Sequence, residues 1–86
     1  EIKYSTRKGF YRANGKALSM EETEGMIKVL IAEDGSILGA HCYGAHSADL
    51  IQEVATLMNY DAKLDKIRDI IHIHPTLSEI LQDALL

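Results

Sequence analysis

Two neighbouring segments, 26–33 and 36–43, are rich in apolar and β-branched residues and are separated by Asp34-Gly35. Short apolar segments on either side of a turn signal are typical of strands. An Asp-Gly pair between two strands predicts a hairpin with a two-residue type I′ loop, in which both central residues have positive φ. One face of the first strand would carry Ile27, Val29 and Ile31. Apolar residues also occupy much of its other face, so we expect a helix to cover one side and another chain or domain the other.

The rest of the chain adds a strand and three helices to this hairpin. A strand is predicted near 1–12, and the acidic stretch within 16–25 is interpreted as a solvated connection. The helical spacing of apolar residues predicts helices near 47–60, 64–71 and 76–85. Ser47 would cap the first, with Asp49 and Glu53 placing negative charge towards its N-terminus. This order of elements predicts the α+β class, with an antiparallel sheet whose central hairpin is packed by helices.

The composition fits one small globular domain that covers residues 1–86. Of the 86 residues, 47% are hydrophobic and 26% are charged, and the net charge is −4. This apolar content excludes a disordered tail, and no apolar run is long enough to cross a bilayer. The excess of acidic residues argues against nucleic acid as a partner.

The ends of the chain and its cysteine content suggest where it comes from. The single cysteine, Cys42, cannot form an internal disulfide and is compatible with a reducing compartment, so we expect a cytoplasmic protein. Because the first residue is Glu1 rather than Met, we expect a processed product, an artificially expressed segment or a piece of a longer protein.

Two histidines separated by one residue, His72 and His74, are the first candidates for chemistry. In an extended segment their side chains point to the same side, where two imidazoles could hold a transition metal. The residues that could complete such a site are His41, Cys42 and His46. The spacing is not that of a zinc motif. The alternative is a pair of structural histidines, one buried and one exposed, in an irregular connection that ends at Pro75.

Glu79 has two alternative interpretations. With Thr76 it forms the Thr-x-x-Glu pattern of a capping box, in which the carboxylate accepts a hydrogen bond from the Thr76 main-chain N–H. With His74 it would form an acid/base pair, because a carboxylate that accepts from one imidazole nitrogen leaves the other nitrogen as a base. The first interpretation places the carboxylate on Thr76 and the second places it on the His74 ring.

The run His72-Ile73-His74-Pro75-Thr76-Leu77-Ser78-Glu79 resembles the C-terminal signature of the flavin-dependent pyridine-nucleotide disulfide oxidoreductases. Within that family it is most similar to the dihydrolipoamide dehydrogenases. Segments resembling the same family are 10–17, 25–29, 37–41 and 53–55, so nearly the whole chain is covered. The fold that this resemblance implies is the family's C-terminal dimerisation domain, truncated at its N-terminus.

The resemblance implies a homodimer in which each subunit inserts a histidine into its partner's active site. Carried over, His74 is the acid/base and Glu79 is its orienting partner. The histidine would deprotonate one thiol of a dithiol substrate, and the thiolate would attack a redox-active disulfide. The resemblance also implies a cis His74-Pro75 bond, with the main chain of both residues facing the partner's flavin.

The cofactors that the resemblance implies belong to the full-length enzyme. FAD and NAD would be bound by its remaining domains and would carry the electrons. The Gly-rich fingerprints for both and the redox-active cysteine pair are absent from the 86 residues, so we expect this piece to bind neither cofactor and to be inactive alone. Asp61 stands where the family has a helix-ending glycine, at a left-handed position that Asp tolerates less well.

Two alternatives from other classes remain open. One is a non-catalytic homodimerisation module with the same fold. The other is a small metal-binding domain that uses His72 and His74.

Overall fold

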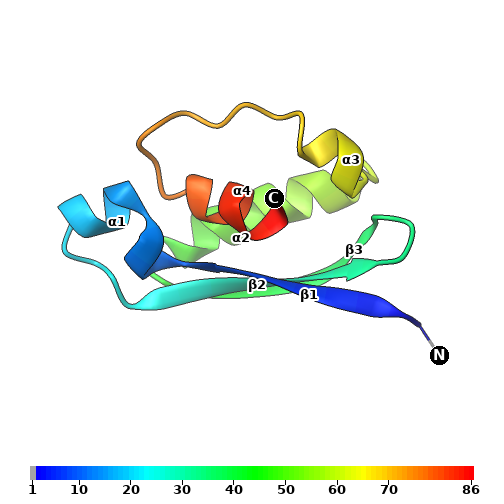
Figure 1. Ribbon diagram of the computed structural model, residues 1–86, viewed down its shortest axis with the longest axis horizontal. Coiled ribbons are helices and arrows are strands. Elements are labelled where there is room, and N and C mark those ends of the chain that lie inside the picture. Colours follow the sequence, from blue (N-terminus) through cyan, green and yellow to red (C-terminus); the bar gives the residue numbers. More distant parts are fainter. Residues whose placement is uncertain (1) are drawn as a thin grey trace.

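A computed structural model describes residues 2–86 and arranges them as one sheet covered by helices (Figure 1). Its strands are β1 (Tyr4–Phe10), β2 (Gly25–Ala32) and β3 (Ile37–Gly44). They pair antiparallel in the order β1-β2-β3. The helical elements are η1 (Tyr11–Ala13), α1 (Gly15–Ser19), α2 (Ser47–Asn59), α3 (Leu64–Ile67) and α4 (Glu79–Leu85). The predicted α+β class and antiparallel sheet are confirmed.

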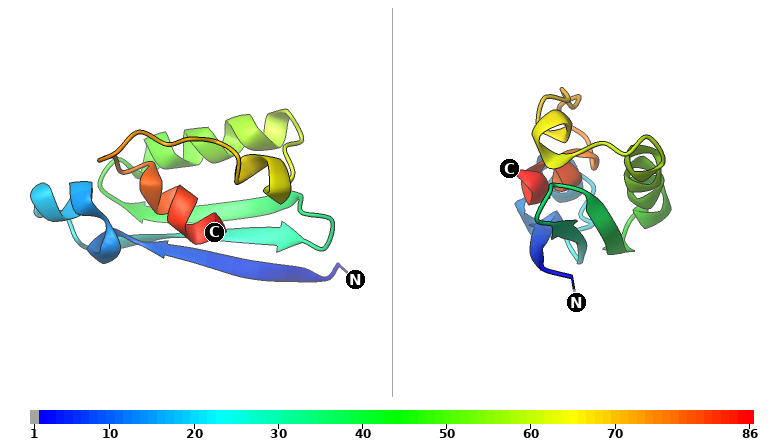
Figure 2. Two further views of the ribbon diagram at one scale, coloured as in Figure 1. Left: turned by 45° about the horizontal axis from the view of Figure 1, so that its top comes forward. Right: turned by 90° about the vertical axis from the view of Figure 1, so that its right-hand side faces the viewer.

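The helices α2, α3 and α4 lie on one face of the sheet (Figures 1 and 2). Helix α4 packs on β1 and β2, and α2 packs on β3. The β2 residues that point towards them are Ile27, Val29 and Ile31, all buried as the alternation predicts. These three side chains and the apolar faces of α2 and α4 form the core, which therefore lies between the two layers.

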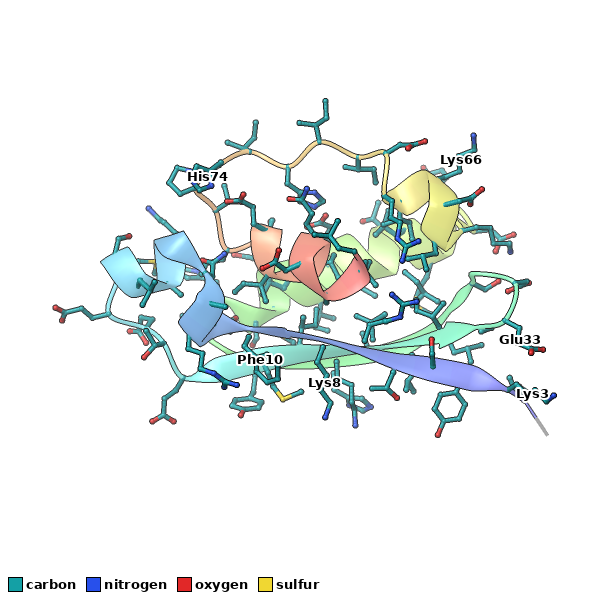
Figure 3. All side chains as sticks on the ribbon, viewed as in Figure 1. Lys3, Lys8, Phe10, Glu33, Lys66 and His74 are labelled. Atoms are coloured by element: carbon teal, nitrogen blue, oxygen red, sulfur yellow. The ribbon has the colours of Figure 1, made fainter. Side chains whose placement is uncertain are left out.

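No element within residues 2–86 covers the opposite face of the sheet. Lys8 and Phe10 point away from the helices there (Figure 3). The alternate β2 residues Met26, Lys28 and Leu30 are only half-buried. The predicted second cover of β2 therefore does not come from the described part of the chain.

The hairpin between β2 and β3 differs from the predicted type I′ turn. Gly35 has a φ of 90°, but Asp34 is not among the residues with positive φ. The Gly35 N–H donates to the Ala32 carbonyl, and the Ala32 N–H donates to the Ser36 carbonyl. The loop therefore has one residue more than predicted. A turn followed by one left-handed glycine closes a three-residue loop, so a second residue with positive φ is not needed.

Three helix boundaries also differ from the sequence expectations. Ser47 is the first residue of α2 and does not cap it. His46 is the N-cap, with a φ of 58° and no side-chain cap. The helix expected near 64–71 ends at Ile67, and the one expected near 76–85 begins at Glu79. The connection expected in 16–25 contains the short helix α1.

The end of α2 is as predicted. Asp61 has a φ of 53°. Its N–H donates to the Met58 carbonyl and the next N–H, that of Ala62, donates to the Leu57 carbonyl. This is the pattern of a Schellman motif, in which a left-handed residue satisfies the last carbonyls of a helix. None of the helices within residues 2–86 is long and apolar enough to cross a membrane.

Tyr11 joins the end of the sheet to the start of α2. Its side chain is fully buried, and its hydroxyl donates to the Ala45 carbonyl at 2.6 Å. Burial raises the pKa of this hydroxyl above its usual range. The ring occupies the space where a side chain at Gly44 would lie: an added Cβ would come within 2.6 Å of it. Gly44 also has a φ of 133°, which disfavours any side chain.

We predict that Gly44→Ala lowers the free energy of unfolding by about 1–3 kcal/mol, because the methyl group collides with the Tyr11 ring and the backbone is left-handed. Gly39→Ala in the same strand is the matched control. Gly39 has no atom within 4 Å of an added Cβ, so this change should be neutral or slightly stabilising. Thermal or denaturant unfolding measures both. Equal effects of the two changes would contradict the packing described for Tyr11.

Candidate functional site

The segment between α3 and α4 presents the candidate catalytic histidine. After α3 the chain runs without helix or strand until α4 begins. Figure 3 shows His74 on the outer loop of this segment, on the helical side of the molecule and away from Lys8 and Phe10. The His74 side chain is 76% exposed. The peptide bond to Pro75 is cis, as the resemblance predicts.

The structure brings His74 and Glu79 together. The Nδ1 atom of His74 lies 2.9 and 3.0 Å from the two carboxylate oxygens of Glu79. An ionised carboxylate can only accept, so Nδ1 carries the proton of this bond. In the neutral ring Nε2 is then the basic nitrogen. No atom of residues 2–86 hydrogen-bonds to Nε2 of His74, so this nitrogen is available to an incoming group.

Glu79 serves both interpretations that the sequence left open. Its Oε1 also accepts a hydrogen bond from the Thr76 N–H at 2.9 Å, as in a capping box. The cap and the histidine pair are therefore compatible, and the expectation that they exclude one another is wrong. The Thr76 N–H and, to a smaller extent, the His74 ring hold the pKa of the Glu79 carboxyl below its usual 4.5.

Asn14 is a buried polar residue that holds the same turn from the other side, and the sequence analysis assigned it no role in the site. It is 6% exposed. Its Oδ1 accepts from the Ala17 N–H at 2.9 Å and so caps α1, while its Nδ2 donates to the Thr76 carbonyl at 3.0 Å. Asn is a favoured residue before a helix, so the cap of α1 has a signal in the sequence. The contact with Thr76 has none, because it spans 62 residues.

His72 has a different partner from His74. Its Nε2 lies 2.6 Å from Oε2 of Glu53 on α2. The His72 side chain is 7% exposed and that of Glu53 is 26% exposed. The two histidines therefore face separate carboxylates rather than a common point.

This arrangement does not form the metal site considered from the sequence. Residues 2–86 contain no group of three or more His, Cys, Asp or Glu side chains placed to hold a metal ion. His46 lies near Asp49, at 3.6 Å, and Cys42 packs beside the core with its Sγ 3.9 Å from the Tyr11 hydroxyl. Burial raises the pKa of the Cys42 thiol, which fits a small core residue better than a thiolate ligand.

Comparisons with known proteins agree on one family. Residues 1–85 match the family described as the pyridine nucleotide-disulphide oxidoreductase dimerisation domain. The chain is 43% identical over 81 residues to dihydrolipoyl dehydrogenase of Synechocystis sp., which covers 93% of the chain and 17% of the relative. It is 44% identical over 75 residues to dihydrolipoyl dehydrogenase of Corynebacterium glutamicum, and this match covers 86% of the chain and 16% of the relative. The chain thus spans about a sixth of these relatives.

Two solved structures share the fold. LpdA of Mycobacterium tuberculosis superposes with a TM-score of 0.89 at 19% identity, over 98% of this chain and 18% of that one. The HOCl-induced flavoprotein disulfide reductase RclA of Escherichia coli, solved as a Cu(II) complex, superposes with a TM-score of 0.88 at 26% identity. This match covers 98% of this chain and 19% of that one.

We predict that Glu79 makes stability depend on pH in the acid range. A carboxyl whose folded pKa lies below its unfolded value of 4.5 stabilises the fold above that value. The contribution is lost as the pH falls through the folded pKa. The difference in unfolding midpoint between the wild type and Glu79→Gln should therefore be present at neutral pH and disappear well below pH 4.5. Glu22→Gln, at an exposed position, is the control. A difference that persists undiminished in acid would contradict the assignment.

Proposed function

Because the chain belongs to the dimerisation-domain family of the pyridine nucleotide-disulphide oxidoreductases, we propose that it joins two subunits of a dihydrolipoamide dehydrogenase-like enzyme and supplies His74 to the partner's active site. The observation that carries this proposal is the His74–Glu79 pair. It combines an oriented ring, a defined tautomer and an exposed Nε2, which are the properties of a general base that acts on a group outside its own domain.

In the proposed reaction His74 moves a proton and forms no covalent bond. Nε2 takes the proton from one thiol of the dithiol substrate. The thiolate attacks the redox-active disulfide of the enzyme, forming a mixed disulfide and releasing one cysteine as a thiolate. His74 gives the first proton to that cysteine thiolate and then takes the proton of the second substrate thiol. The second substrate thiolate displaces the other cysteine as a thiolate, so that the substrate is oxidised to its disulfide and the enzyme disulfide is reduced. The charge that His74 gains faces the Glu79 carboxylate, which stabilises it.

FAD and NAD fit this scheme as groups held elsewhere in the enzyme. When bound, they would pass the electron pair from the reduced cysteines to the nicotinamide. His74 and Pro75 are both exposed in this domain, as residues that face a flavin held by the partner subunit would be. A homodimer is the expected assembly, because the family is that of a dimerisation domain. We expect the enzyme to work in the cytoplasm, with neither nucleic acid nor a membrane as its partner.

Exposed apolar side chains beside the histidine support an interface on this side of the molecule. Ile71 is 90% exposed and Ile73 is 74% exposed. They flank His72 in a segment that precedes the histidine turn. Large apolar side chains that project fully into solvent are costly, and burial against a second subunit would remove that cost.

We predict that His74→Gln in the full-length enzyme lowers the turnover of dithiol oxidation by about 100-fold or more, because the general base is lost. Reduction of the flavin by NADH should be nearly unchanged, because that half-reaction does not need the base. Glu79→Gln should have a smaller effect, since Gln keeps an acceptor for the Thr76 N–H and removes only the charge. Stopped-flow and steady-state assays measure the two half-reactions separately.

His41→Gln is the control for these variants, because His41 is exposed on β3, away from the histidine turn. It should leave both half-reactions unchanged. Near-normal dithiol turnover in His74→Gln would overturn the catalytic proposal and favour a dimerisation module without chemistry.

A further inference from the structure

The segment that carries His74 is almost entirely exposed, yet it contains one buried side chain. From residue 68 to residue 75 every residue is exposed except His72, which points into the molecule. His72 is 7% exposed as a side chain and pairs with Glu53 of α2 at 2.6 Å. On the N-terminal side of His74, this pair is the nearest contact that attaches the segment to the helical layer.

A second attachment lies on the other side of His74. Thr76 is held by Asn14, which donates to its carbonyl at 3.0 Å, and by Glu79, which accepts from its N–H at 2.9 Å. The Thr76 hydroxyl donates to the Ile73 carbonyl at 2.7 Å and so closes the turn between the two attachments. His74 thus lies between two fixed points, each two residues away.

We propose that Glu53 and His72 are positioning residues for the acid/base histidine, and that they fix the N-terminal end of the turn that presents His74. This inference rests on the proposed function. Only one residue separates His72 from His74 in the chain, so a displacement of the His72 main chain also displaces the His74 ring. Proton transfer is sensitive to such displacement, because a misplacement of about 1 Å can cost about 100-fold in rate.

The geometry also assigns the tautomer of His72. The Glu53 carboxylate only accepts, so Nε2–H of His72 donates to it. The Nδ1 atom of His72 is buried and has no hydrogen-bond partner within residues 2–86. His72 lines a cavity of about 10 Å³, whose other lining residues include the apolar Ile67, Leu81 and Leu85 and the polar Arg68 and Gln82. His72 therefore anchors the chain through its Nε2–H and, unlike His74, has no exposed ring nitrogen for proton transfer.

The test is made in the full-length enzyme. Glu53→Ala removes the acceptor and should lower kcat for dithiol oxidation about 10- to 100-fold while changing KM and flavin reduction by NADH little. Glu53→Gln keeps a side-chain carbonyl for the His72 Nε2–H and should restore most of the lost kcat. Gln52→Ala, at the neighbouring exposed position of α2, is the matched control and should behave as the wild type. A general loss of folding would reduce both half-reactions together and would not be rescued by Gln.

The outcomes separate this inference from the proposed function. Low dithiol turnover in His74→Gln with a normal kcat in Glu53→Ala would overturn the positioning role alone. Normal turnover in both variants would overturn the proposed function. Nitrogen NMR of the wild-type histidine rings gives a test that needs no stable variant. We expect His72 protonated at Nε2 and His74 at Nδ1 in the neutral state, and a His72 protonated at Nδ1 would overturn the inference.

Discussion

The candidate site depends on one carboxylate that accepts two hydrogen bonds at once. Glu79 binds the main-chain N–H of Thr76 and the Nδ1–H of His74, so the start of α4 and the orientation of the imidazole are set by the same group. This coupling gives an exposed histidine a fixed tautomer without burying it. A surface histidine would ordinarily rotate among several rotamers, whereas this one is tied to the first residue of a helix whose other face is in the core.

The strands could be predicted from the sequence because their signal is local. Ile27, Val29 and Ile31 alternate with less buried residues, and the structure places them against the helices. The predictions of local structure were wrong where the chain could adopt either of two turn or cap conformations. One left-handed glycine at Gly35 replaced the expected pair of positive-φ residues, and Ser47 became the first helical residue because His46 adopted the left-handed conformation before it. The short helix α1 was missed because its five residues carry almost no apolar period.

The site was predictable only as far as its residues are close in sequence. The His74–Glu79 pair spans five residues and follows from the motif, together with the cap that was first considered its rival. The contacts that hold the turn in place span much more. Glu53 is 19 residues from His72, and Asn14 is 62 residues from Thr76. The hydrophobic periodicity of the sequence does not reveal contacts between residues so far apart in the chain. The sequence predicted one buried and one exposed histidine as an alternative to a metal site, and packing shows that His72 is the buried one.

The central claim is that His74 acts on the active site of the other subunit. The most direct test is a heterodimer made from one full-length subunit with His74→Gln and one with its redox-active cysteines changed to serine. If the histidine acts across the interface, the intact cysteines of the first subunit meet the intact His74 of the second, and one of the two sites oxidises dithiol. If it acts within its own subunit, or takes no part, the heterodimer shows no more activity than the better of the two parent homodimers, and the account is wrong.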